Sequence, residues 1–295
     1  MTPLSPAVSV VVATRNRPAR LRSCLTAVQQ ALRPGDELIV VDSASTTGEV
    51  MSVAEAAGAR VLRLHVAGAS RARNAGWMAA RHPLIAFTDD DCLPRPGWLN
   101  ALARNEESGF VTGRVEATAP VDRPVAVKTD SEPAVLDATT TEPLGASNNL
   151  LVRRELLERV GGFDERLGPG TWTASAEDLA LFDRLLHAGG AGRYEPDALV
   201  LHEQWRGRRE LVRLDWGYGK GQGARLALLH NLDRARSRDR RRHLLWDQGA
   251  SSAVRDLRAG YEFGALTTAV RTLGTAVGYG YGRVALTSLW TGEVT

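Results

Sequence analysis

The sequence predicts an α/β protein with a mainly parallel central sheet flanked by helices, and three observations support this class. Short apolar runs, rich in β-branched residues, alternate with segments of helical spacing from Val8 to Phe87. Each run is continuous rather than alternating in polarity, as in strands that are buried on both faces of a parallel sheet. A polar loop follows the first, second and fourth runs, at the point where each strand should end.

The predicted elements follow one another along the chain. We expect strands at residues 8–13, 38–41, 61–64 and 84–87, with helices at 21–28, 50–57 and 70–80 between them. A less regular second half has expected strands at 110–117 and 194–200 and expected helices at 154–160 and 176–188. Residues 118–143 and 168–175 are predicted loops. Beyond residue 205 the chain becomes basic, with six arginines in 234–242, and the glycine-rich segment 216–223 is predicted to be flexible.

Length and composition limit the class of protein. The chain has 295 residues, 43% of them hydrophobic and 24% charged, which suits one large globular domain or one domain with an appendage. A formal net charge of +3 is too small to indicate a nucleic-acid partner. Cys24 and Cys92 form neither a disulfide framework nor a metal-type spacing, which is typical of the reducing cytosol. Because we find neither a signal peptide nor a long apolar stretch, we expect a cytoplasmic protein.

The segment Leu84–Trp98, LIAFTDDDCLPRPGW, joins a buried strand to three consecutive carboxylates, Asp89, Asp90 and Asp91. Adjacent carboxylates repel one another, and a divalent cation relieves that repulsion. Mg²⁺ and Mn²⁺ prefer oxygen ligands and are held by one or two carboxylates together with substrate phosphates. The loop is therefore a candidate site for a metal that binds a nucleotide diphosphate. The alternative is a solvated acidic turn, with Asp91 near the start of a helix.

Two further polar loops, Thr14–Arg17 and Asp42–Thr46, also follow predicted strands. In a parallel sheet the ligand binds beyond the carboxyl ends of the strands, so all three loops should meet at one edge. The sequence contains neither GxGxxG after the first strand nor GxxxxGK[ST], which excludes a dinucleotide fingerprint and a P-loop.

Seven segments stand in a characteristic order over roughly residues 7–223. They are VSVVVATRNR, IVVDSAS, GASRARNAG, FTDDDCLPRPGWL, GASNNLLVRRELLERVGGFDERLG, AEDLALFDRLLHAG and DALVLHE. Each is weak by itself, but their order and spacing together are specific. On these segments the chain resembles the family 2 glycosyltransferases of the GT-A fold, which have a Rossmann-like α/β catalytic domain.

The resemblance implies a nucleotide-diphosphate-sugar donor, expected to be UDP-linked, a divalent metal (Mn²⁺ or Mg²⁺), and transfer with inversion at the anomeric carbon. Asp42 matches the residue that pairs with the base. The residues expected around the rest of the nucleotide are Ala13, Thr14, Arg15, Asn16, Arg73, Asp89 and Asp90. Asp91 and His202 match metal ligands, and Asp178, supported by Glu177, matches the general base that activates the acceptor hydroxyl.

Each of these roles has a structural alternative. Glu177 and Asp178 could simply cap a helix, and His202 could be a buried hydrogen-bonding residue. Asn148 and Asn149 could bind sugar hydroxyls or form a turn before a strand. Further candidates are Trp172, which could stack on a sugar or pack in the core, and Lys220, which could close over the diphosphate or lie in a solvated loop.

We predict a catalytic domain at residues 1–205 and a mostly helical C-terminal extension at 206–295. The processive signature Gln-x-x-Arg-Trp is scrambled in Gln204-Trp205-Arg206, which favours transfer of a single sugar over polymer synthesis. The alternatives are a sugar-1-phosphate nucleotidyltransferase and a non-enzymatic protein that binds anions or membranes. The acceptor remains open among glycans, lipid carriers, proteins and small metabolites. The arginines at 234–242 are expected on a solvated helix face, and the segment 264–290 is a candidate for peripheral contact with the inner face of a membrane.

Overall fold

The computed structural model describes residues 6–105, 107–121, 123–140 and 145–286. By their internal contacts the residues group in two units, which we describe separately. The first comprises Met1–Phe163 and Arg184–Gln204, and the second comprises Asp164–Asp183 and Trp205–Thr295. The sequence predicts a boundary after residue 205; the second unit also includes the segment that carries Trp172, Glu177 and Asp178.

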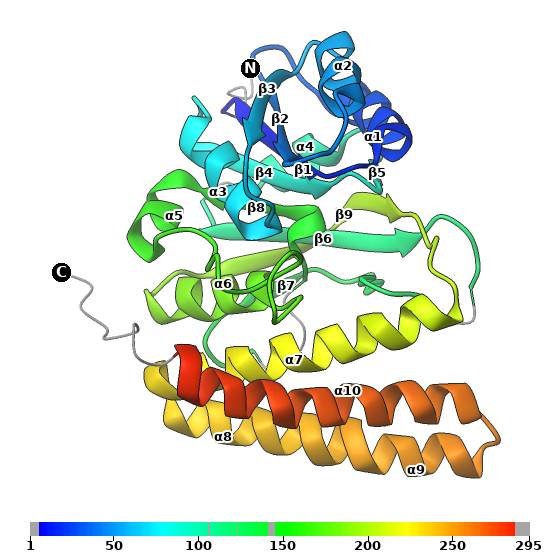
Figure 1. Cartoon of the computed structure of the whole chain (residues 1–295). Coiled ribbons are helices and arrows are strands. Elements are labelled where there is room, and N and C mark those ends of the chain that lie inside the picture. Colours follow the sequence, from blue (N-terminus) through cyan, green and yellow to red (C-terminus); the bar gives the residue numbers. More distant parts are fainter. Residues whose placement is uncertain (1–5, 106, 122, 141–144, 287–295) are drawn as a thin grey trace. The chain divides into compact units, whose positions relative to one another are not determined.

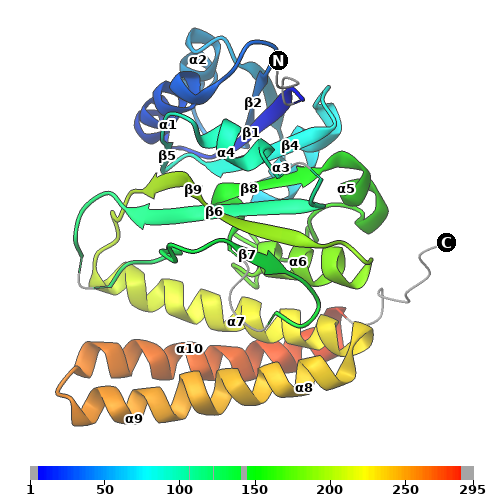
Figure 2. The same ribbon diagram turned by 180° about the vertical axis from the view of Figure 1, so that it is seen from behind.

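A mixed sheet forms the centre of the first unit (Figures 1 and 2). Its strands are β1 (Val8–Thr14), β2 (Glu37–Ser43), β3 (Arg60–Leu64), β4 (Leu84–Asp89), β5 (Cys92–Pro94), β6 (Phe110–Ala117), β7 (Ala134–Leu136), β8 (Leu150–Arg153) and β9 (Gly192–His202). They lie in the order β3-β2-β1-β4-β8-β6-β9-β5, with β7 beside β9. The first four strands in this order are parallel, whereas β8 runs antiparallel to both β4 and β6. The predicted α/β class is confirmed, and each of the first four predicted strands is present.

Helices cover both faces of the parallel part of the sheet. Alternate side chains of β1 point to opposite faces, and Val10 and Val12 share a buried cluster with α1 (Pro18–Ala31), α2 (Glu49–Ala56) and α4 (Trp98–Ala103). Val11 points to the other face and packs against α3 (Ala69–Ala79) at Gly76, where a Cβ would overlap the valine side chain. Burial on both faces accounts for the continuous apolar runs in the sequence.

Arg154, in the first turn of α5 (Arg154–Val160), holds the end of α3 in place. Its guanidinium donates hydrogen bonds to the carbonyl oxygens of Trp77 at 3.1 Å, Ala80 at 2.5 Å and His82 at 3.1 Å. These carbonyls lie at the C-terminus of α3 and just beyond it, where carbonyl oxygens lack partners within the helix. The arginine therefore ties together segments that are more than 70 residues apart in the sequence.

The second unit is mostly helical, as predicted. It contains α7 (Arg208–Leu232), α8 (Arg234–Arg242), a π-helical stretch His243–Ala250, α9 (Ser251–Arg258), α10 (Glu262–Tyr281) and a π-helical stretch Gly282–Leu286. The helix α6 (Glu177–His187) begins in this unit and ends in the first. In Figure 1, α7 and α10 run side by side, and their residues make extensive contacts. Of the segment 264–290, residues 287–290 lie outside the described residues.

The prediction of flexibility at 216–223 is wrong, because these residues lie inside the long helix α7. Gly219 and Gly223 face α10, and a Cβ on either would collide with backbone atoms of that helix, at the carbonyl oxygens of Arg271 and Thr275 respectively. Glycine here permits two helices to approach closely, and the packing outweighs its low helix propensity. Lys220 is consequently a helical residue and does not lie in a loop.

The predicted loop at 118–143 contains the short strand β7, and otherwise lacks helix and strand at its described positions. Within the described parts of the chain, we find no helix with both the length and the apolar character needed to cross a membrane.

Candidate functional site

The ends of β1, β2 and β4 lie side by side in the first unit, and the ends of β2 and β4 carry carboxylates. In the strand register Thr14 of β1 is level with Asp42 of β2, and Ala13 is level with Asp89 of β4. The predicted convergence of the three polar loops at one edge of the sheet is thus present. The loops are also joined directly, since the backbone amide of Asn16 donates to Ser45 Oγ at 2.9 Å and the side chain of Asn16 accepts from the amide of Thr46 at 2.8 Å.

Asp90 lies at the centre of this edge and is buried. Its carboxylate accepts hydrogen bonds from Thr14 Oγ1 at 2.7 Å and from Arg17 Nη1 at 2.9 Å. Burial raises the pKa of Asp90 to about 6, against the opposing effect of the Arg17 charge. Arg17 Nη1 also lies 3.5 Å from Asp91 Oδ2, so one guanidinium faces two adjacent carboxylates. Our reading of the sequence assigned no role to Arg17, although it closes the loop after β1.

Asp91 and His202 form a candidate metal centre. His202 ends β9 and is level with Cys92 of the neighbouring β5, which directly follows Asp91. Its Nε2 lies 3.4 Å from Asp91 Oδ1, and both side chains are buried. Two donor atoms at this separation can share one ion at the bond lengths of about 2.1 Å that Mn²⁺ and Mg²⁺ favour. Cys92 Sγ lies in the same cluster, but burial raises the pKa of its thiol, and a protonated thiol is a poor ligand for a hard cation.

The other ring nitrogen of His202 is held by the loop after β6. Nδ1 lies 3.0 Å from the carbonyl oxygen of Val125, which accepts a hydrogen bond when Nδ1 carries the proton. Burial disfavours the charged imidazole and lowers its pKa. The hydrogen bond to Asp91 and the negative charge of Asp91 outweigh burial, so the pKa of His202 is raised. A histidine whose second N–H is fixed by a backbone carbonyl is the usual arrangement at metal sites.

Asp42 presents a buried acceptor that has no hydrogen-bond donor among the described residues. Its Oδ1 accepts from the amide of Ser45 at 2.9 Å, whereas Oδ2 is buried and its nearest cation is Arg63 Nε at 3.7 Å. A buried carboxylate oxygen without a hydrogen bond is costly unless a ligand supplies the donor. Arg73 of α3 approaches the neighbouring strand end, where its Nη2 donates to Asp89 Oδ1 at 2.6 Å. Arg15, by contrast, is exposed.

The side chains of Asn148 and Asn149 differ in how many of their hydrogen-bonding atoms are already engaged within the protein. The side chain of Asn149 is fully engaged: it accepts from Trp98 Nε1 and donates to the carbonyl oxygens of Arg114 and Ala198. These contacts favour a structural role for Asn149, which fastens β6, β9 and α4 to one another. Asn148 donates to the carbonyl of Ala126, but its Oδ1 is buried with no hydrogen-bond partner among the described residues.

The predicted base belongs to the second unit. Glu177 and Asp178 occupy the first turn of α6, where the helix dipole favours their ionised forms. Glu177 is buried, and Asp178 is partly exposed. Tyr218 of α7 lies within electrostatic range of both, and burial, together with their negative charge, raises the pKa of its phenol to about 12. Tyr218, to which our sequence analysis assigned no role, is therefore a neutral phenol in the same part of the second unit.

Trp172 and Lys220, which were predicted to serve the sugar and the diphosphate separately, lie together in the second unit. Lys220 Nζ donates to the carbonyl oxygen of Trp172 at 2.5 Å and lies 4.5 Å from the centre of its ring. The indole ring also stacks against Tyr281 of α10, with 4.1 Å between ring centres, and the tryptophan is 44% exposed. A half-exposed aromatic ring beside a cation can pack against a sugar.

Backbone strain is concentrated in the loops that carry these residues. Among the described residues, the non-glycine positions with left-handed φ angles are Asn16, Ala44, Ala126, Ala174 and Ala176. Each lies in the loop after β1, β2 or β6, or immediately before Glu177. Alanine in this conformation costs about 1 kcal/mol, and such residues gather at functional sites. The strain supports the site assignment independently of any resemblance.

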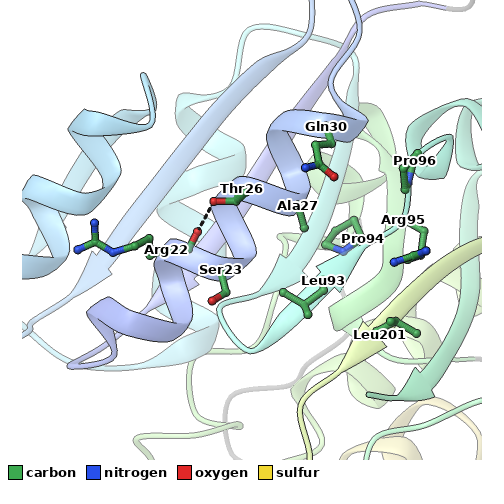
Figure 3. A pocket seen from close by; sticks show the side chains of 10 residues that line it. All are labelled: Arg22, Ser23, Thr26, Ala27, Gln30, Leu93, Pro94, Arg95, Pro96 and Leu201. Carbon is green, nitrogen blue, oxygen red and sulfur yellow. Dashed lines mark hydrogen bonds between the residues drawn. The ribbon is translucent and has the colours of Figure 1, made fainter. Parts of the chain in front are cut away.

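A pocket of about 420 Å³ lies between α1 and the β5–β9 pair (Figure 3). Leu93 and Leu201, a register pair, line it. Successive residues of a strand point to opposite faces, so the pocket is on the other side of the strands from Cys92 and His202. It lacks titratable carboxylates and histidines among its lining residues, and we assign it no catalytic role.

The chain is similar in sequence to known glycosyltransferases. Residues 9–160 match the family described as Glycosyl transferase family 2. A pre-mycofactocin glycosyltransferase of Mycobacterium tuberculosis is 32% identical over 238 residues, which cover 76% of this chain and 48% of the relative. The chain thus spans about half the length of that relative. Glycosyltransferase AglE of Haloferax volcanii is 29% identical over 75% of both chains.

Two solved structures share the fold. The mannosyltransferase PcManGT of Pyrobaculum calidifontis, solved with GDP-Man and Mn²⁺, aligns with a TM-score of 0.69 and 17% identity, covering 95% of this chain and 88% of that one. Residues 1–349 of S. aureus TarS align with a TM-score of 0.63 and 15% identity, covering 94% of this chain and 90% of that one. The family match and the similarity of the tuberculosis relative together show that this chain belongs to glycosyl transferase family 2 and has the GT-A fold.

Proposed function

We propose that the chain is a metal-dependent, inverting glycosyltransferase that moves one sugar from a nucleotide-diphosphate donor to an acceptor hydroxyl. Two observations at the carboxyl edge of the sheet together carry this proposal, the close Asp91–His202 pair and the unsatisfied Oδ2 of Asp42. One group fits a cation and the other fits a hydrogen-bond donor on a ligand. A nucleotide diphosphate has both, since its phosphates hold metal and its base carries N–H groups.

The chemistry assigns separate tasks to the residues. Asp42 Oδ2 accepts a hydrogen bond from the base, and Thr14, Asn16, Arg73 and Asp89 surround the rest of the nucleotide. Asp91 and His202 would hold Mn²⁺ or Mg²⁺, and an ion bound there would neutralise the charge on the departing diphosphate.

The remaining step is proton transfer. The acceptor hydroxyl attacks the anomeric carbon from the face opposite the diphosphate and gives its proton to Asp178, so that a C–O bond to the acceptor forms as the donor C–O bond breaks. Glu177, which precedes Asp178 in the first turn of α6, supports it in this role. Trp172 and Lys220 serve the sugar or the acceptor, and Asn148 Oδ1 offers an acceptor for a sugar hydroxyl.

The nucleotide is the less constrained part of the proposal. UDP is our expectation from the family pattern around Asp42, while the complex of PcManGT with GDP-Man makes GDP the alternative to test. The acceptor remains a glycan, lipid carrier, protein or small metabolite, and pre-mycofactocin is one acceptor to include because a relative is named for it. We propose a cytoplasmic enzyme that meets its acceptor at the inner face of a membrane.

Thermal unfolding in the presence of nucleotide sugars tests the donor. UDP- and GDP-linked sugars are added with Mn²⁺, with Mg²⁺ and with a chelator, because a ligand that binds the folded state raises the melting temperature. We expect one nucleotide class to stabilise the chain only when metal is present. Release of free nucleoside diphosphate then identifies sugar transfer or donor hydrolysis, whereas release of pyrophosphate would identify the nucleotidyltransferase alternative.

A further inference from the structure

The outer face of α10 presents a continuous apolar stripe. Its exposed positions between Glu262 and Arg283 are Leu266, Ala269, Leu273, Ala276, Val277 and Gly280, and none of these residues is polar or charged. They recur at helical spacing, and Val284 extends the stripe at 84% exposure. From Leu266 to Val284 the stripe is about 27 Å long, at 1.5 Å per residue.

The interior side of the same helix is already occupied. Gly274 and Gly278 lie against the backbone of α7, and Thr272 contacts Gly249 of the π-helical stretch before α9. The stripe is therefore a second apolar surface and is not the packing face of the bundle. In the segments before α10, Trp246 of the π-helical stretch is 64% exposed and Leu257 of α9 is 59% exposed.

The C-terminal helical region that bears this stripe, residues 205–286, is strongly basic. Residues 205–286 contain sixteen arginine or lysine residues and seven carboxylates, an excess of nine positive charges, whereas the whole chain has a formal charge of +3. The positive charge is thus concentrated in the helical region. It repels a second copy of the same surface and attracts a negatively charged one.

Part of this charge gathers at one end of the stripe. Burial lowers the pKa of His230, and the nearby positive charges of Arg283, Arg234, Arg241 and Arg238 lower it further. Arg283 immediately precedes Val284, and Arg241 lies 4.8 Å from the ring centre of Tyr279. Arginines from α8 and from the π-helical stretch after α10 therefore gather near the end of the stripe that carries Val284, its most exposed side chain.

We infer that this face of α10 and α9 binds an anionic lipid surface, with the apolar stripe in the headgroup region and the arginines on lipid phosphates. The inference rests on and deepens the peripheral membrane contact of the proposed function, by naming the face and the lipid chemistry. A lipid surface suits these features because it accepts a long apolar stripe without a shaped partner and supplies the opposite charge. A second copy of the chain would instead bring two basic regions together.

Co-sedimentation of the full chain with vesicles tests the inference. The vesicles contain either phosphatidylcholine alone or phosphatidylcholine mixed with phosphatidylglycerol, at low and at physiological salt. We expect pelleting only with the anionic vesicles, and weaker pelleting as salt rises. The double variant Leu273→Gln/Val277→Gln should bind at least about tenfold more weakly, because the apolar side chains no longer enter the lipid. Arg238→Gln and Arg283→Gln should each weaken binding about fivefold.

Matched controls come from the first unit. Met78 is 61% exposed, as is Leu273, so Met78→Gln makes the same kind of change elsewhere and should leave pelleting unchanged. Arg81→Gln is the corresponding control for charge, since the Arg81 side chain is 74% exposed. All variants should keep the thermal shift with donor and metal, which separates this inference from the donor assignment.

Three results would overturn the inference. The first is the absence of pelleting with anionic vesicles at low salt, and the second is an equal loss of binding in the Met78 and Leu273/Val277 variants. The third is a dimer, detected by analytical ultracentrifugation without vesicles, that the Leu273→Gln/Val277→Gln variant dissociates; the stripe would then be an interface between copies of the chain.

Discussion

His202 donates from Nδ1 to a backbone carbonyl while its Nε2 lies 3.4 Å from Asp91 Oδ1. In the metal-free protein both ring nitrogens can carry protons, which agrees with the raised pKa of the imidazole. A metal that binds at this point must replace the proton on Nε2. Metal binding and proton release are therefore the same event at this residue.

This coupling predicts the pH dependence of metal affinity. Because the pKa of His202 is raised above its ordinary value, a proton competes with the metal to higher pH, and affinity for Mn²⁺ should rise as pH rises through the folded pKa. Calorimetric titration in buffers of different ionisation enthalpy measures the protons released. The folding stability of the metal-free protein should change with pH in the opposite direction. The stabilisation from His202 is complete below its unfolded pKa and is lost as pH rises through the folded pKa. A pH-independent affinity would exclude His202 as a ligand.

Asp91→Asn should abolish metal-dependent donor binding. The substitution removes one charge and keeps the shape of a buried side chain, so the fold should survive. Calorimetry with UDP and Mn²⁺ measures the affinity, and Asp197→Asn, at an exposed carboxylate of the same unit, is the control. Parental affinity in Asp91→Asn would assign the metal to other residues.

Asp178→Asn separates catalysis from binding. A positioned carboxylate contributes about a hundredfold to ten-thousandfold through general-base catalysis, so turnover should fall by that factor while donor affinity stays nearly unchanged. Asparagine can still cap a helix, and the capping explanation therefore predicts little change in either quantity. Donor hydrolysis supplies the rate before an acceptor is known. If the turnover number falls further in Glu177→Gln than in Asp178→Asn, Glu177 is the base.

Arg154→Ala should lower the free energy of unfolding by about 2 kcal/mol or more, because three backbone carbonyls lose a charged donor. Arg153→Ala, at the preceding residue, is the matched control. The side chain of Arg153 pairs with the exposed Glu155, and its removal should cost less than about 1 kcal/mol. Urea unfolding of both variants measures the difference. Equal values would show that the carbonyls find other donors.

Gly223→Ala should disrupt the packing of α7 on α10, since its Cβ would collide with the carbonyl oxygen of Thr275. Gly280→Ala is the opposite case within α10, because no atom lies within 4 Å of the added Cβ. It should stabilise the helix by up to about 1 kcal/mol through propensity alone. Melting temperatures that move in opposite directions would support the close helix contact, and a neutral Gly223→Ala would contradict it.

The sequence predicted the strands and the acidic edge because these depend on local pattern. Apolar runs identify buried strands; Asp42 lies near the end of β2, and Asp90 directly follows β4. The glycines of α7 misled the prediction, since the close approach of a second helix from a distant segment is not visible in local propensity. Arg17 was missed for a related reason: its partners, Asp90 and Asp91, are more than 70 residues away. The engagement of Asn149 by Trp98 is equally non-local.

The alanines with left-handed backbones strain the folded chain but keep the loops ordered. Ala44 and Ala126 are held in conformations that glycine adopts without penalty. Their strain arises when the chain folds, before any ligand arrives, so a nucleotide meets loops that are already bent. Replacing these alanines with glycine would relieve the strain in the folded state and restore freedom to the loops. Such variants should bind donor more weakly even where their melting temperature does not fall, because each binding event would again have to order the chain.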